Sequence, residues 1–144
     1  MGSVSVNRQT AINRMKKYKI FFWTSTIIIF LFEGVMPAFT FQSEMAKEGI
    51  RHLGYPEYFM TILVVFKILG VLALVIPQIP PRVKEWAYAG FAFDFIFASF
   101  SHLSVDGFGF NVIFPWIFFA ILVVSYVSYH KIRAVKSSYV RSAL

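Results

Sequence analysis

The stretch TILVVFKILGVLALVI, residues 61–76, decides the fold class of this protein. Its only charged residue is Lys67, and the residues around it are almost all apolar. Residues 25–32, STIIIFLF, likewise lack the alternation of apolar and polar residues. Barrel strands alternate between apolar and polar residues, whereas lipid-facing helices are apolar without interruption. Residues 91–97, FAFDFIF, alternate with a period of two and alone would suit a barrel strand. The longer runs nevertheless predict an all-α protein.

The composition of the 144-residue chain indicates a polytopic membrane protein with one four-helix bundle. Hydrophobic residues make up 58% of the chain and charged residues 15%, so a soluble fold would expose much apolar surface to water. Four stretches are long enough, or nearly so, to cross a bilayer as helices, which takes about 20 residues. These predicted spans cover residues 20–41, 58–77, 85–103 and 111–129.

The basic residues indicate topology rather than nucleic-acid binding, although the net charge is +7. They form short clusters beside the apolar runs, and no basic stripe of the kind that binds a nucleic acid is evident. Eleven of the 14 lysines and arginines flank span ends on one side, and only Lys47 and Arg51 lie on the other. Because cytoplasmic loops are rich in lysine and arginine, we expect both termini in the cytoplasm.

Three regions follow from this topology. We expect residues 1–14 to form a mobile cytoplasmic tail, residues 15–133 the membrane domain, and residues 134–144 a basic cytoplasmic tail. The chain has no cysteine, which excludes disulfides, cysteine-ligated iron–sulfur clusters and covalent c-type haem on this chain. No set of residues predicts a metal site.

Three of the predicted spans contain an ionisable residue far from both ends, namely Glu33, Lys67 and Asp94. Each costs about 2.5–3.5 kcal/mol at a helix centre unless it is compensated. With a rise of about 1.5 Å per residue, Glu33 lies about 20 Å from the cytoplasmic edge of its span, and Lys67 and Asp94 lie about 13–15 Å from the outer edge. The sequence therefore predicts a polar cluster at the centre of the bundle.

The third predicted span has a stripe of small and polar residues that would face the bundle. Steps of about 100° per residue place its members on one side of the helix and the phenylalanines on the flanks and back, where they would face lipid or pack between helices. This stripe comprises Ala87, Gly90, Asp94, Ala98 and Ser101. Ser101 and the adjacent His102, at the outer end, join the three central charges as candidate ligand-binding or proton-relay residues.

Two features are expected to shape the cluster. Pro37 lacks an N–H group, so the carbonyl of Glu33 loses its usual donor and the helix should kink there. Gly70, one turn from Lys67, would let another helix or a ligand approach the ammonium group.

The cluster has a formal charge of −1, because it has two carboxylates and one ammonium group. One carboxylate should therefore take up a proton, bind a cation or meet a positive group of a ligand. The alternative is a structural role, in which the ion pairs only fix the register of the helices.

Several segments resemble the DoxX-like family of small bacterial membrane proteins over about residues 15–133. The resemblance rests on residues 52–59, HLGYPEYF, residues 66–95, FKILGVLALVIPQIPPRVKEWAYAGFAFDF, and the SH pair at 101–102. It implies a four-helix bundle in the bacterial cytoplasmic membrane. The family takes its name from a subunit of an archaeal thiosulfate:quinone oxidoreductase. The positions that match the family motif are Lys67, Gly70, Trp86 and His102.

Three functions remain open. The resemblance implies a membrane subunit of a redox complex, in which Lys67 polarises a quinone carbonyl, Glu33 or Asp94 relays protons, and a partner protein supplies electrons. If the chain is part of an enzyme, it is then an oxidoreductase subunit. The second alternative is a non-catalytic module that binds or transports a lipophilic, cationic small molecule, and transport would require a homo-oligomer. The third is a structural or assembly factor.

Overall fold

The computed structural model describes residues 2–143, and all regular structure in that range is helical, as the sequence predicts. Its elements are the α-helices α1 (Gly2–Ile29), α2 (Met36–Thr40), α3 (Glu44–His52), α4 (Glu57–Val75), α5 (Pro81–Asp106) and α6 (Phe110–Ala143), with a π-helix η1 (Phe30–Val35) between α1 and α2.

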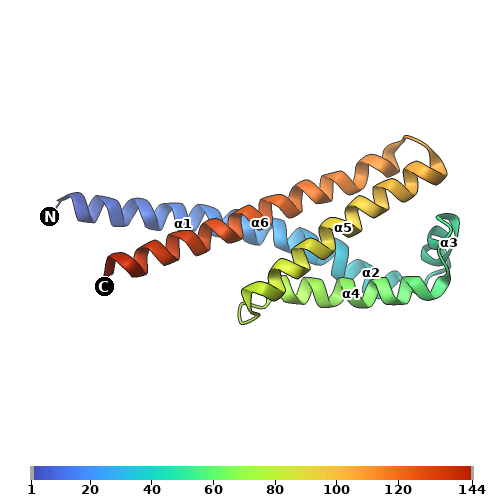
Figure 1. Cartoon of the computed structure of the whole chain (residues 1–144), viewed down its shortest axis with the longest axis horizontal. Coiled ribbons are helices and arrows are strands. Elements are labelled where there is room, and N and C mark those ends of the chain that lie inside the picture. The colour runs from blue at the N-terminus through green and yellow to red at the C-terminus, as the bar shows by residue number, and fades with distance from the viewer. Residues whose placement is uncertain (1, 144) are drawn as a thin grey trace.

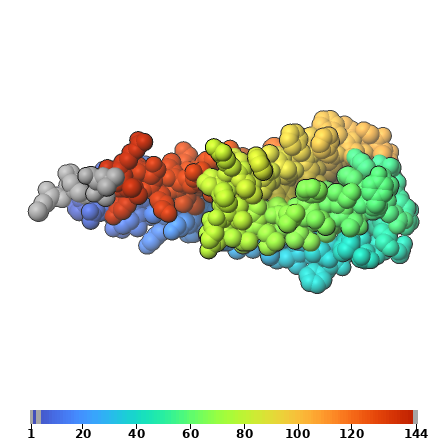
Figure 2. All heavy atoms as spheres, turned by 60° about the horizontal axis from the view of Figure 1, so that its bottom comes forward, coloured from blue at the N-terminus to red at the C-terminus, as the bar shows by residue number. Residues whose placement is uncertain are grey.

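Residues 2–40, which are helical throughout, form an elongated bundle with α4, α5 and α6 (Figure 1). α1 packs along α6, and α5 packs against both α6 and α4. η1 packs against α4. α4 and α6 run in the same direction, and α5 runs back between them. The first part of α1 and the last part of α6 project beyond the loop that joins α4 to α5 (Figure 2).

The core is a narrow apolar layer between the helices. Its buried members are Ile29, Val71, Leu74, Tyr88, Phe91, Phe95, Phe118 and Leu122. Many large apolar side chains point outward instead, and Phe66, Phe93 and Phe97 are each at least 60% exposed. Exposed apolar surface on this scale suits a lipid environment and not water. The helices therefore have the character of an integral membrane protein.

Three helical stretches are long and apolar enough to cross a membrane: Ser5–Thr40, Glu57–Val75 and Phe110–Ser142. They contain, wholly or nearly so, the spans predicted at residues 20–41, 58–77 and 111–129. α5 has the necessary length, with 26 residues, but Asp94 and its serine, histidine and glycine residues lower its hydropathy. Composition therefore does not establish the span predicted at residues 85–103.

The segment between the first two spans is more ordered than a loop. Ser43 caps α3, since its hydroxyl accepts a hydrogen bond from the Ala46 amide at 3.3 Å. At the other end of α3, Arg51 forms two ion pairs: its Nη1 atom lies 2.9 Å from Glu48 Oε2, and its Nη2 atom lies 2.8 Å from Glu57 Oε1. A serine cap with an acidic first turn and a basic last turn is a helix signal that the apolar pattern alone does not reveal.

Both terminal helices extend past the predicted spans. α1 begins at Gly2 and α6 ends at Ala143, so most of the two predicted tails continue the helices of the bundle. A span counts only apolar residues, whereas a helix can continue into water through polar ones. The mobility expected of residues 1–14 stays a prediction.

Lys84 holds the junction between α4 and α5. Its buried ammonium group donates hydrogen bonds to the carbonyls of Ala73, Leu74 and Ile76 at 2.8, 3.0 and 2.8 Å. The last carbonyls of a helix lack partners within it, and a cation there also interacts favourably with the helix dipole. Lys84 therefore caps α4, a role that its contribution to the topology signal does not predict.

Candidate functional site

The structure brings together the three charges predicted to lie inside the bundle. Glu33 comes from η1, Lys67 from α4 and Asp94 from α5. The Lys67 Nζ atom lies 2.5 Å from Glu33 Oε2 and 2.9 Å from Asp94 Oδ2. We call these three residues the central cluster. A single ammonium group thus joins three helical segments.

The central cluster is largely shielded, with 12–18% of each side chain exposed. An ammonium group has three N–H donors. Two of them face Glu33 and Asp94, and the third has no acceptor among residues 2–143. The site therefore offers one strong hydrogen-bond donor. It also has two carboxylates but only one ammonium group, so one carboxylate charge is not neutralised.

A π-helix carries Glu33 into the central cluster. In η1 the Met36 amide donates to the carbonyl of Leu31, five residues earlier, where an α-helix would use the fourth. Pro37 follows directly and has no N–H to donate. The sequence predicts a kink at this proline, and the structure shows a wide turn just before it. Such π-bulges occur often at functional sites.

Two glycines allow α4 to approach its neighbours closely. A Cβ atom at Gly34 would lie 2.7 Å from Val71 Cγ2, and one at Gly70 would lie 2.8 Å from Phe91 Cε2. Gly34 thus sets the distance between η1 and α4, and Gly70 sets the distance between α4 and α5. The group that approaches at Gly70 is the ring of Phe91, close in sequence to Asp94.

The buried face of α5 differs from the small-residue stripe predicted to face the bundle. Its buried members are Lys84, Tyr88, Phe91, Phe95 and Ser99. Gly90 is exposed, and Asp94 is only partly buried beside this face. Two phenylalanines therefore fill the core, because large rings bury more apolar area than alanine or glycine can. The buried face therefore lies on one flank of the predicted stripe, and Phe91 and Phe95 pack between helices, which is one of the two placements expected of the phenylalanines.

Ser101 and His102 lie apart from the central cluster. Ser101 is seven residues beyond Asp94 on α5, or about 10 Å along the axis, and its hydroxyl is 2.8 Å from that of Tyr55. His102 Nδ1 lies 2.7 Å from Asp106 Oδ2, and His52 contacts the other oxygen of Asp106. These contacts tie α3 and its following loop to the end of α5.

Sequence reasoning missed Asp106 and the partnership of His52 with it. The spacing of four residues between His102 and Asp106 places both on one face of a helix, and this signal could have been found. The pairing with His52 joins residues 54 positions apart, and no local pattern reveals it.

The stability contributed by Asp106 should depend on pH. Hydrogen bonds from His102 and His52 hold the pKa of this carboxyl below its ordinary value of 3.8. A lowered pKa in the folded state stabilises the fold above the unfolded-state pKa, and this contribution is lost as the pH falls through the folded-state pKa. Asp106→Asn should therefore be less stable than wild type at pH 6, and the difference should shrink below pH 3.8.

Denaturant unfolding at pH 6 and at pH 3 would check this expectation. Glu48→Gln is a suitable control, because it removes a carboxylate on α3 that pairs with Arg51 and not with a histidine. A deficit of Asp106→Asn that is the same at both pH values would contradict the assignment.

A second polar group lies deeper in the bundle, between α1, α5 and α6. The Ser125 hydroxyl is 2.8 Å from those of Thr26 and Tyr88. All three residues are buried. Hydroxyl groups that satisfy one another inside a membrane bundle hold helices together, and we assign these residues a structural role.

Comparison with known proteins identifies the family. A family model described as the DoxX-like family matches residues 22–125. No curated protein and no solved structure matches the chain. The matched range includes the whole central cluster as well as Ser101 and His102. The match covers well over half of the chain, which therefore belongs to the DoxX-like family.

Proposed function

We propose that this protein is a four-span subunit of a redox complex in the bacterial cytoplasmic membrane, and that its central cluster binds a quinone. The observation that carries the proposal is the Lys67 ammonium group, which Glu33 and Asp94 hold inside the bundle with one N–H free. A charged donor in a low-dielectric site is a strong partner for a quinone carbonyl.

The arrangement of the helices supports the fourth span. α4 and α6 run in the same direction, and only residues 76–80 and 107–109 separate α5 from them. If α4 and α6 both cross the bilayer, α5 must carry the chain back across it. Its 26 residues extend for about 39 Å, enough for a hydrocarbon core of about 30 Å. The basic clusters support cytoplasmic termini.

The carboxylates supply the proton chemistry of this proposal. Reduction of a quinone to a quinol takes two electrons and two protons. The electrons would come from a redox partner protein, and Glu33 and Asp94 lie where they could pass protons to oxygens held by Lys67. Ser101 and His102 would assist only as an entry point on the outer side, since they are about 10 Å from Asp94.

A second candidate follows from the excess carboxylate. Glu33 and Asp94 together carry one more negative charge than Lys67 neutralises, and a cationic lipophile would balance it. In that case the protein is a binding module without catalytic activity, and transport would require a homo-oligomer.

Mass spectrometry of the solvent extract from gently purified protein tests the proposal. We expect a quinone at about one molecule per site in wild type and in Lys47→Met, a lysine change at the outer surface. It should be absent from Lys67→Met and reduced in the nearly isosteric Glu33→Gln. A different lipophile with the same pattern would favour the binding module. An empty extract from all four proteins would leave the central cluster as a structural link and defeat both proposals.

A further inference from the structure

A hollow on α1 combines cations with apolar side chains. Its volume is about 500 Å³, and its lining residues are Asn13, Lys16, Lys17, Ile20 and Phe21. Spacings of three, four, seven and eight residues place all five on one face of the helix. Ile20 is 66% exposed and Phe21 is 47% exposed. No aspartate or glutamate occurs before Glu33, so no acid competes for these cations along this helix.

The hollow faces away from the bundle. α1 packs on its neighbours through Phe22, Thr26 and Ile29, which are buried. Ile20 lies about 160° around the helix from Phe22, on the opposite side. Among residues 2–143, the residues that line the hollow all belong to α1, and lipid is the natural occupant where α1 enters the membrane.

The position of the hollow along the helix axis matches the boundary between the headgroup layer and the hydrocarbon core of a bilayer. Ile20 begins the apolar run, and Lys16 and Lys17 lie three or four residues before it, or about 5–6 Å along the axis. The headgroup layer of each leaflet is about 5–7 Å thick, as the difference between the full bilayer and its hydrocarbon core shows. The two ammonium groups thus lie at the level of lipid phosphates.

We propose that this hollow binds an anionic phospholipid of the leaflet on the N-terminal side of α1, which is the cytoplasmic leaflet in the predicted topology. Lys16 and Lys17 hold the phosphate, and the Asn13 amide donates a hydrogen bond to the headgroup. Ile20 and Phe21 contact the first part of an acyl chain. A topology signal needs only net charge near the span, whereas this site needs its charges on one face of α1.

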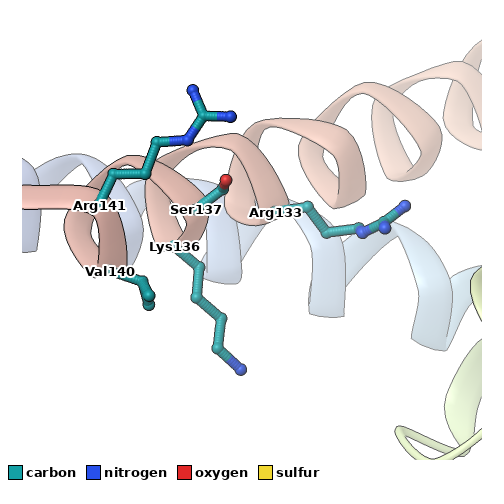
Figure 3. A pocket seen from close by; sticks show the side chains of 5 residues that line it. All are labelled: Arg133, Lys136, Ser137, Val140 and Arg141. Atoms are coloured by element: carbon teal, nitrogen blue, oxygen red, sulfur yellow. The ribbon is translucent and has the colours of Figure 1, made fainter. Parts of the chain in front are cut away.

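The hollow on α6 does not offer the same arrangement. It measures about 410 Å³ and is lined by Arg133, Lys136, Ser137, Val140 and Arg141. The charged ends of Arg133, Lys136 and Arg141 point away from one another (Figure 3). A single phosphate could not contact all three. Val140 lies well beyond Tyr129, where the predicted span ends, so it is too far from the hydrocarbon core to meet an acyl chain.

Native mass spectrometry of the full chain in detergent, with added phosphatidylglycerol or phosphatidylcholine, tests the site. We expect wild type to retain phosphatidylglycerol in preference to phosphatidylcholine. Lys16→Gln/Lys17→Gln should lower the affinity for phosphatidylglycerol by at least about tenfold, given the attraction of each lysine to an anionic surface. Arg8→Gln/Lys19→Gln is the matched control, since it removes two charges from the same helix at positions about 100–120° around α1 from Ile20.

Each outcome decides the proposal. Loss of phosphatidylglycerol from the Lys16/Lys17 variant alone supports it. Equal loss from both double variants would show a general attraction to charge and overturn it, as would equal retention of the two lipids by wild type. Excess inorganic phosphate should displace little bound lipid, because it lacks the acyl chain that Ile20 and Phe21 contact. Full displacement would mean that the hollow is a site for free phosphate.

Discussion

Lys67→Met should lower the free energy of unfolding by about 3 kcal/mol, at the lower end of the cost of breaking a buried ion pair because the cluster is partly exposed. The substitution leaves Glu33 and Asp94 side by side in the bundle without the cation that joins them. Two carboxylates at this separation repel each other unless at least one binds a proton. Unfolding of the purified protein by denaturant in detergent, followed by circular dichroism, measures the change.

The triple variant Lys67→Met/Glu33→Gln/Asp94→Asn should recover most of this loss. It removes the uncompensated charges together with the cation, and apolar or neutral replacements of buried ion networks are often tolerated. Lys47→Met is the matched single control, because Lys47 pairs with Glu44 at the surface and such pairs contribute little. Full stability of Lys67→Met would show that the ion pairs do not hold η1, α4 and α5 together.

Gly34→Ala should lower the free energy of unfolding by about 2 kcal/mol, in the range for overpacking of a tight contact. The new Cβ atom would lie 2.7 Å from Val71 Cγ2, closer than real contacts allow. Val71 is 2% exposed and β-branched, so it can neither move into open space nor easily change rotamer in its helix. η1 must then move away from α4, which also separates Glu33 from Lys67.

Rescue by a second substitution would identify the cause. Val71→Ala removes both γ-methyl groups, and the remaining Cβ–Cβ distance of 3.4 Å is acceptable. Gly34→Ala/Val71→Ala should therefore be less destabilised than the two single changes predict together. Gly49→Ala, on α3, is the control, since a Cβ atom there meets nothing within 4 Å. A large loss that Val71→Ala does not reduce would point to η1 itself rather than to this contact.

The central cluster could be predicted because charge is costly in a membrane. A chain that places Glu33, Lys67 and Asp94 at similar depths in different helices has few ways to compensate them other than pairing them. The family could also be predicted, because the resemblance rests on sequence motifs, and the family model that matches residues 22–125 confirms it. The roles of these residues toward a ligand do not follow from pairing and need the experiments above.

The inner face of α5 could not be predicted in the same way. The rule that small residues face neighbouring helices describes a tendency, and here Phe91 and Phe95 occupy the core while Gly90 is exposed. Which face turns inward depends on the space that α4 and α6 leave. Gly70 creates that space for the ring of Phe91. This information lies in a different helix.

By itself, the sequence determined the all-α class, the membrane character and the set of charges that must meet, because these follow from local apolar runs and from the cost of charge in lipid. Only the tertiary structure decided the π-turn at Glu33, the cap that Lys84 places on α4 and the contact of His52 with Asp106. The cap and the histidine contact depend on how one helix is placed against another, and the π-turn lies where Gly34 packs against Val71 of α4. A local sequence pattern does not specify such packing.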